Sequence, residues 1–141
     1  MGFLSAQDEE AVKKEFERLG GSVKLTVFAS ELGPETNAQT VRLMQEVAAL
    51  SDKLSVSVLN PHIDRERAQA YAIDASPAVV VEGERDYGIR FLGIPAGYEF
   101  SNLIDSIIAV SNGEAALSAD TKAALAALPE AVTIKVFSTP T

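Results

Sequence analysis

The sequence predicts an α/β fold in three layers, α/β/α, built on a mixed four-stranded sheet. Between residues 23 and 111, apolar side chains switch between strand spacing and helical spacing in the order β, α, β, α, β, β, α. The first β-α-β part requires parallel strands, because a helix carries the chain back between them. The last two strands are separated by a short turn and predict an antiparallel hairpin, which a final helix closes.

An amphipathic helix is expected before the first strand. Ser5 and Asp8 have the spacing of a capping box, in which each side chain accepts a hydrogen bond from the other residue's backbone. Apolar residues then recur on one helical face as far as Leu19. Gly20-Gly21 follows directly and predicts the end of this helix.

The next segment predicts a buried strand, a loop and a second helix. Residues 23–29 are rich in β-branched and aromatic side chains. Residues 30–37 contain Gly33 and Pro34 and predict a loop. Asn37 is expected to cap a helix that continues to about residue 50, because its side chain can accept a hydrogen bond from the first free backbone N–H groups.

Five further segments complete the predicted sheet and its helices. Strands are indicated by alternation or by β-branched runs, and helices by apolar residues at helical spacing. The expected elements are a strand at 54–59, a helix capped by Asp64 and reaching about Tyr71, strands at 78–81 and 88–92, and a helix carrying residues 100–108. The breaks fall at Asn60-Pro61 and at the turn of residues 83–86.

Composition excludes several classes of function. A chain with 20 acidic and 12 basic residues would repel a nucleic-acid backbone. No apolar run approaches the roughly 20 residues that span a bilayer, and the first residues lack the basic and apolar regions of a secretion signal. We therefore expect a cytoplasmic protein that binds neither nucleic acid nor membranes.

The chain has no cysteine and only one histidine. It can form no disulfide, thiolate nucleophile or sulfur-ligated metal site. His62 follows Pro61 in a polar loop, has no second histidine near it, and is expected to be a solvated side chain. We expect no catalytic residue, no metal and no cofactor in this chain.

After Asn112-Gly113 the pattern of the first residues begins again. Leu117-Ser118-Ala119 matches Leu4-Ser5-Ala6, and residues 132–137 (VTIKVF) match residues 23–28 (VKLTVF). The sequence thus predicts one domain at residues 1–112 and the first helix and strand of a second, truncated repeat at residues 113–141. We interpret the chain as a fragment cut inside that repeat.

The element order, the repeat and several short motifs resemble the tandem glutaredoxin-like protein disulfide oxidoreductases of the thioredoxin superfamily. The matching segments are residues 1–5 (MGFLS), 52–55 (DKLS), 93–100 (GIPAGYEF), Ser76-Pro77 and 137–141 (FSTPT). The resemblance covers essentially the whole chain and implies a thioredoxin-like fold. An inert first unit before an active one also resembles the N-terminal region of the flavoprotein component of alkyl hydroperoxide reductase.

In that family a CxxC motif stands at the start of the helix after the first strand, where the helix N-terminus stabilises a thiolate. The resemblance places Pro34 and Asn37 at the two cysteine positions, and neither side chain can form a thiolate. It also implies that a second-unit CxxC would begin just after Thr141. The alternative interpretation of residues 34–37 is an ordinary turn between a strand and a capped helix.

The family resemblance further implies that the peptide bond between Ser76 and Pro77 is cis. Such a bond leaves the backbone N–H and C=O of Ser76 free to pair with an extended peptide. The alternative is a purely structural role, in which Pro77 fixes the entry into the third strand.

The resemblance and the missing cysteines together predict a redox-inactive first unit of a protein disulfide oxidoreductase, acting in cell redox homeostasis. Its role would be to scaffold or dock a catalytic second unit, and the longer protein would be the enzyme. The alternative is a free-standing peptide-binding module that uses the edge at Ser76 and Pro77. The unpaired strand at 132–137 also predicts a homodimer or an added edge strand.

Overall fold

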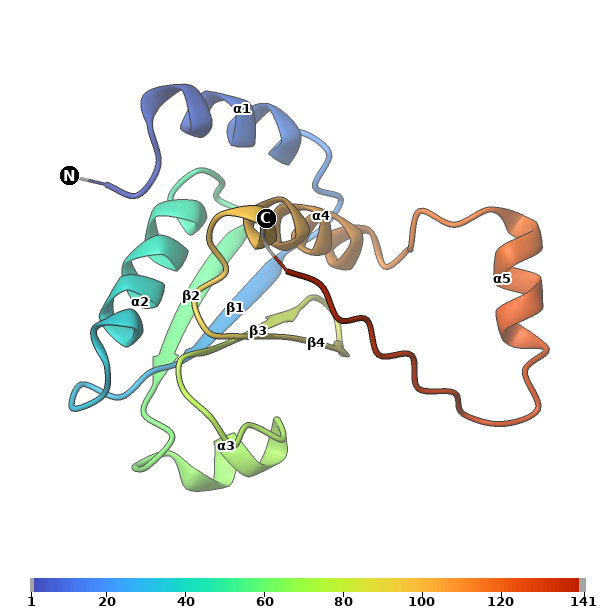
Figure 1. Cartoon of the computed structure of the whole chain (residues 1–141). Coiled ribbons are helices and arrows are strands. Elements are labelled where there is room, and N and C mark those ends of the chain that lie inside the picture. Colours follow the sequence, from blue (N-terminus) through green and yellow to red (C-terminus); the bar gives the residue numbers. More distant parts are fainter. Residues whose placement is uncertain (1, 140–141) are drawn as a thin grey trace.

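A computed structural model of the chain describes residues 2–139 (Figure 1). Helices and strands alternate in the predicted order over most of its length. In sequence they are α1 (Ala6–Phe16), β1 (Val23–Phe28), α2 (Glu35–Ala48), β2 (Leu54–Leu59), α3 (Arg65–Ala70), β3 (Ala78–Glu82), β4 (Asp86–Leu92), α4 (Tyr98–Asn112) and α5 (Ala119–Ala126).

The four strands form one mixed sheet in the order β2-β1-β3-β4. β1 runs parallel to β2, with α2 between them, and antiparallel to β3. β3 and β4 form an antiparallel hairpin. The predicted β-α-β part and the predicted hairpin are therefore both confirmed.

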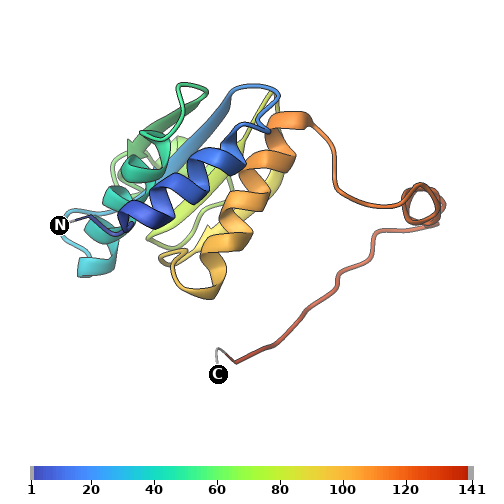
Figure 2. The same cartoon turned by 90° about the horizontal axis from the view of Figure 1, so that it is seen from above.

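Helices α1, α2 and α4 cover one face of this sheet, and α1 lies over the other two (Figure 2). Alternate residues of β1 point into this layer, where they pack against buried side chains of all three helices. The buried helical side chains are Val12 and Phe16 of α1, Leu43, Met44 and Val47 of α2, and Leu103, Ile104, Ile107, Ile108 and Val110 of α4.

The short helix α3 lies on the opposite face (Figure 1). A second buried cluster forms beneath it, in which Phe28 of β1 and Val80 of β3 contact Ala68 and Ile73. The molecule thus has the three layers that the sequence predicts.

The ends of several elements differ in detail from those expected. The capping box of Ser5 and Asp8 forms, but α1 ends at Phe16, before Gly20-Gly21. Asp64 directly precedes α3, yet its carboxylate accepts a hydrogen bond from the backbone N–H of Asn60 at 2.9 Å and does not cap the helix. β4 begins at Asp86, which pairs with Glu82 across a β-bulge that lengthens the hairpin.

The segment after α4 is exposed along its whole described length. Gly113 ends α4 in the left-handed conformation, with φ of 66°, and every residue from Asn112 to residue 139 is exposed. Ser118 caps α5 by accepting a hydrogen bond from the backbone N–H of Thr121, as Ser5 caps α1.

The strand expected at residues 132–137 does not form. These residues belong to no helix or strand, and Ile134, Val136 and Phe137 are at least 82% exposed. A strand needs a hydrogen-bonded neighbour, and this segment lies beside none of the four strands (Figures 1 and 2). Residue 1 of the matched segment 1–5 and residues 140–141 of the matched segment 137–141 lie outside the described part of the chain.

Candidate functional site

The candidate site lies where β1 and β2 end, β3 begins and β4 ends. Phe28 pairs with Leu59 in β2 and with Ala78 in β3, and Ala78 pairs with Leu92 in β4. Four loops therefore meet at one end of the sheet, which we call the sheet end. They comprise residues 29–34, 60–64, 72–77 and 93–97. The sheet end contains both predicted motifs, residues 34–37 and residues 76–77.

Pro34 is exposed and occupies the N-cap position of α2. Its φ of −55° suits a helix start, and a proline there removes an N–H group that the helix would leave unpaired in any case. The sequence prediction that Asn37 caps this helix is therefore wrong. The helix begins three residues earlier than expected, at Glu35, and Asn37 lies inside its first turn.

Asn37 is nearly fully buried, with 2% of its surface exposed. Its Oδ1 accepts a hydrogen bond from the backbone N–H of Ser30 at 2.9 Å, and its Nδ2 donates one to the backbone C=O of Pro34 at 3.2 Å. The side chain thus fastens the loop of residues 30–34 to the first turn of α2. Carboxamides carry out no acid-base or nucleophilic chemistry at neutral pH, so this arrangement is structural.

A cleft of about 390 Å³ lies beside this loop. Its lining combines apolar side chains of the loop, α2 and β2 with three charged ones. The lining residues are Ala29, Ser30, Glu31, Gly33, Pro34, Glu35, Asn37, Ala38, Val41, Arg42 and Val58. The two positions that the resemblance assigns to cysteines thus lie on a surface hollow without a thiol.

The peptide bond between Ser76 and Pro77 is cis, as the family resemblance implies. Pro77 is buried, and its C=O accepts a hydrogen bond from the N–H of Gly93 at 2.8 Å. Ser76 is partly exposed, and within residues 2–139 its backbone N–H and C=O have no hydrogen-bond partner. A second cleft of about 190 Å³ lies next to it, lined by Pro61, His62, Ile73, Asp74, Ala75 and Ser76.

The structure therefore brings the two predicted motifs to the same end of the sheet but into separate hollows. Pro34 and Asn37 line the larger cleft, and Ser76 lines the smaller one. His62, expected to be solvated, is exposed and lies on the rim of the smaller cleft.

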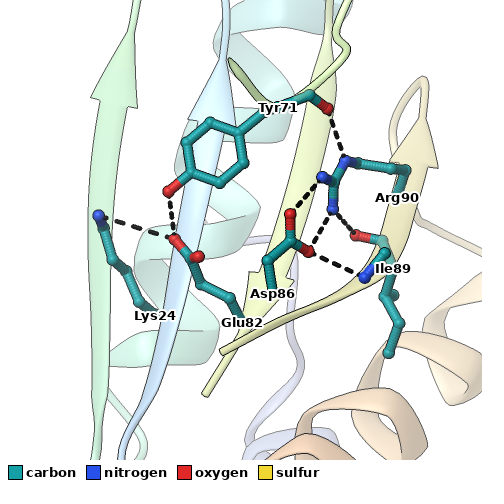
Figure 3. A network of polar contacts seen from close by, with 7 residues as sticks. Lys24, Tyr71, Glu82, Asp86, Ile89 and Arg90 are labelled. Atoms are coloured by element: carbon teal, nitrogen blue, oxygen red, sulfur yellow. Dashed lines mark hydrogen bonds and ion pairs between the residues drawn. The ribbon is translucent and has the colours of Figure 1, made fainter. Parts of the chain in front are cut away.

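A polar network on the face covered by α3 was not predicted from the sequence (Figure 3). Glu82 accepts a hydrogen bond from the Tyr71 hydroxyl at 2.5 Å and lies 3.8 Å from the ammonium of Lys24. The guanidinium of Arg90 binds both carboxylate oxygens of Asp86, at 2.8 and 2.6 Å, and donates to the backbone C=O of Tyr71 at 3.0 Å.

This network shifts the ionisation of its members. The hydrogen bond from Arg90 holds the pKa of Asp86 below its usual value. The hydrogen bond between Tyr71 and Glu82 raises the pKa of the Tyr71 phenol. The only sequence signal for it was the alternation of charged and apolar residues in β4, because Tyr71 and Lys24 join from other elements. The network connects the hairpin to the end of α3 and lies away from the sheet end.

Comparisons with known proteins bear on the fold. No protein-family model matches the chain, and no curated protein matches it significantly. Two solved structures of the alkylhydroperoxide reductase AhpF from Enterococcus faecalis are similar to it at 23% sequence identity. One is the NTD_N/C domain of AhpF, with a TM-score of 0.82 over 91% of this chain and 62% of that chain. The other is a mutant form of AhpF, with a TM-score of 0.81 over 90% of this chain and 62% of that chain.

A protein disulfide oxidoreductase from Aeropyrum pernix K1 is 27% identical, with a TM-score of 0.77 over 88% of this chain and 55% of that chain. The chain thus spans less than two thirds of the length of these structures. Residues 1–112 are 112 of 141 positions, so a match over 91% of the chain includes part of the segment after Asn112. The chain therefore has a thioredoxin-like fold without a CxxC motif, and it is similar in structure to the N-terminal NTD_N/C domain of AhpF and to a protein disulfide oxidoreductase.

Proposed function

We propose that this chain is the redox-inactive N-terminal unit of a protein disulfide oxidoreductase in the cytoplasm, where it scaffolds or docks a catalytic second unit. The observation that carries the proposal is a complete thioredoxin-like fold whose chain contains no cysteine. Thiol–disulfide exchange requires an attacking thiolate, so this unit cannot perform it.

The site geometry supports a structural role for the first unit. Asn37 holds the loop and the first turn of α2 together by two hydrogen bonds, which keeps the fold intact where the resemblance expects a cysteine pair. The hydrogen bonds of its buried amide stabilise the loop conformation, which therefore does not depend on a cysteine pair.

The segment after Asn112 supports the existence of a second unit. α5 repeats the serine cap of α1, and the structural match to the AhpF domain continues past Asn112. α5 buries no side chain, which is the behaviour expected of a repeat element whose packing partners lie further along the chain.

The test compares this chain with the longer reading frame that continues beyond Thr141, in an assay of disulfide reduction in a protein substrate. This chain is expected to show background activity, and the longer protein to be active through a CxxC in its second unit. Replacing those cysteines with serine should return the longer protein to background. Activity in this chain, or no activity in a longer protein with an intact second CxxC, would contradict the proposal.

A second candidate is a free-standing peptide-binding module. The unpartnered backbone groups of Ser76 favour it, because an extended peptide can pair with them as an added strand does. Titrating this chain with extended peptides and following the amide spectrum tests it. Shifts centred on residues 75–78 are expected, and a spectrum unchanged by every peptide would exclude this role.

A further inference from the structure

The sheet has two edge strands, β2 and β4, and their outer backbone groups are treated differently (Figure 1). An edge strand presents N–H and C=O groups that no neighbouring strand pairs with. Proteins usually block such an edge with charged side chains or a β-bulge, because it can otherwise pair with another chain. In this molecule β4 is blocked and β2 is open.

β4 blocks its own edge with the side chains of Asp86 and Arg90. The carboxylate of Asp86 accepts a hydrogen bond from the backbone N–H of Gly88 at 2.9 Å. The guanidinium of Arg90 donates one to the backbone C=O of Ile89 at 3.0 Å (Figure 3). Gly88 also has a φ of 88°, and a bulge interrupts the register at Glu82. A further strand therefore cannot pair regularly along β4.

β2 carries none of these features. Its six residues, LSVSVL, include no charged residue, proline or glycine. It pairs with β1 in an unbroken register from Leu54 to Leu59. Within residues 2–139, no side chain or loop forms a hydrogen bond with the backbone of Val56 or Val58 on the outer side of β2. β2 thus presents a regular, uncharged edge.

The hydrogen bonds to β1 identify the residues of β2 that face outward. The backbone C=O of Leu59 accepts a hydrogen bond from the N–H of Ala29, directly after β1, at 2.9 Å. Successive residues of a strand direct their backbone groups to opposite edges. Leu54, Val56 and Val58, at the alternate positions, therefore direct their N–H and C=O groups toward the open edge.

We propose that β2 pairs antiparallel with β2 of a second copy of this chain, so that the two sheets become one continuous sheet. A twofold axis perpendicular to the sheet at Val56 places this residue opposite itself. The same axis places Leu54 opposite Val58 of the second copy. All three outward residues then meet as hydrogen-bonded pairs of an antiparallel ladder. The pairing uses no residue of the two redox-related motifs and is independent of the function proposed above.

The side chains also match in this register. On the face covered by α2, Val56 meets Val56, and Leu54 meets Val58, so apolar side chains lie opposite apolar ones. Val58 is 46% exposed in the single copy and would be covered. On the other face, Ser55 meets Ser57 of the second copy, and two hydroxyl groups can share a hydrogen bond there.

The pattern of β2 favours a second copy as the occupant. Apolar residues alternate with serine on both sides of Val56, so the strand presents the same pattern in both chain directions, as an isologous contact requires. Beyond the strand, Asp52 lies opposite Asn60 of the second copy, and Lys53 lies opposite Leu59. No like charges therefore meet along the contact.

The exposed segment of residues 132–137 is the alternative occupant. It is connected to the domain through Gly113, which lies beside Tyr87 of β4 at the opposite edge of the sheet. It is therefore not placed to cover β2 of the same copy. Pairing of this segment with β2 of another copy is an outcome that the variants below separate from the proposed contact.

The first experiment measures the mass of this chain in solution against concentration by sedimentation equilibrium. The mass should rise from that of one chain toward that of two and no further, because the twofold contact uses both open edges. Higher salt should favour the dimer, since each copy carries a net charge of −8. A mass of one chain at every soluble concentration, or growth beyond two, would overturn the proposal.

A proline variant tests the strand. Val58→Pro removes an outward N–H but leaves the ladder to β1 intact, because edge strands tolerate proline at such positions. It should weaken dimerisation at least about tenfold, since two hydrogen bonds are lost across the contact. The matched control, Val136→Pro, makes the same change in the C-terminal segment and should leave the dimer unchanged. A dimer that survives Val58→Pro, or that is lost in the control, would contradict the proposed contact.

Charge variants test the antiparallel register. Ser55→Lys with Ser57→Lys should give a monomer, because each lysine then faces a lysine of the second copy. Ser55→Glu with Ser57→Glu should behave likewise. An equal mixture of the two double variants should form a dimer again through lysine–glutamate pairs. Both positions are at least partly exposed, and amide spectra check that each variant keeps the fold. A mixture of folded variants that stays monomeric would rule out this register.

Discussion

Asn37 holds the loop before α2 against the helix with both ends of its amide. The sequence indicated a capping role from the chemistry of asparagine, but placed it at the wrong helix position. A helix can start at a proline because of the local geometry of the proline ring. The hydrogen-bond partners of a buried amide, in contrast, depend on how the loop folds back onto the helix. Its contacts with Ser30 and Pro34 therefore became visible only in the structure.

Removing this amide should destabilise the domain. Asn37→Ala leaves the N–H of Ser30 buried without a partner, so we expect the free energy of unfolding to fall by about 1–3 kcal/mol. Urea denaturation measures the loss. Thr36→Ala, on the exposed side of the same turn, is the control and should change stability by less than about 0.5 kcal/mol. A variant at position 37 as stable as the wild type would show that the amide is dispensable.

Residues 34 and 37 also allow a direct test of their correspondence to a CxxC motif. In Pro34→Cys with Asn37→Cys, we expect the exposed thiol at position 34 to have a pKa below the ordinary value of about 8.5, because it lies at the N-terminus of α2. The rate of alkylation against pH measures it. Gln45→Cys, exposed near the other end of the same helix, is the control and should titrate normally or higher. Equal pKa values at both ends would contradict the correspondence.

Among the elements, α1 and α5 begin with the same serine cap but differ in packing. α1 buries Val12 and Phe16 in the main core, where it packs beside α4, and α5 buries nothing. The sequence predicted the cap of α1 and the match of residues 117–119 to residues 4–6, because capping depends on residues only three apart. Whether a helix buries side chains depends on residues far away in the sequence, and α1 and α5 differ in this respect.

This contrast predicts different effects of the same substitution. Ser5→Ala should lower the free energy of unfolding by about 1 kcal/mol, since α1 belongs to the cooperative core. Ser118→Ala should leave the unfolding midpoint unchanged and reduce only the helicity of residues 119–126. Chemical denaturation and residue-level amide shifts separate these effects. A comparable loss of stability in both variants would show that α5 is packed in solution.

Asp86 and Arg90 form an ion pair within β4, between its first residue and its fifth. The depressed pKa of Asp86 means that its contribution to stability is present above the unfolded value of about 3.9 and is lost as the pH falls through the folded value. Asp86→Asn should therefore cost up to about 1 kcal/mol at pH 7, because solvent screens a surface pair, and this cost should shrink as the pH falls through the folded pKa of Asp86. Urea unfolding over a series of pH values below 7 tests this, with Asp105→Asn on α4 as the control. A stability gap that stays constant as the pH falls would point to another cause.

At the scale of the whole molecule, residues 2–113 form a packed domain and the remainder extends from it without burial. We expect the amides of residues 132–137 to exchange with solvent rapidly in this chain and to be protected in the longer protein, where a second unit would supply a neighbouring strand. Hydrogen exchange measured on both proteins tests this. Protection that rises with the concentration of this chain would indicate strand pairing between copies, and protection at every concentration would contradict the expectation.

No helix within residues 2–139 has the length and apolar character needed to cross a membrane.

The sequence by itself determined the order of the elements, the parallel and antiparallel parts of the sheet, the serine caps and the absence of thiol chemistry. These properties depend on residue types and on spacings of a few residues, so they can be read along the chain. Only the tertiary structure decided that Asn37 is buried, that Tyr71 and Lys24 join the network around Glu82, and that residues 132–137 remain unpaired. Each of these depends on contacts between residues far apart in sequence, which local patterns do not encode.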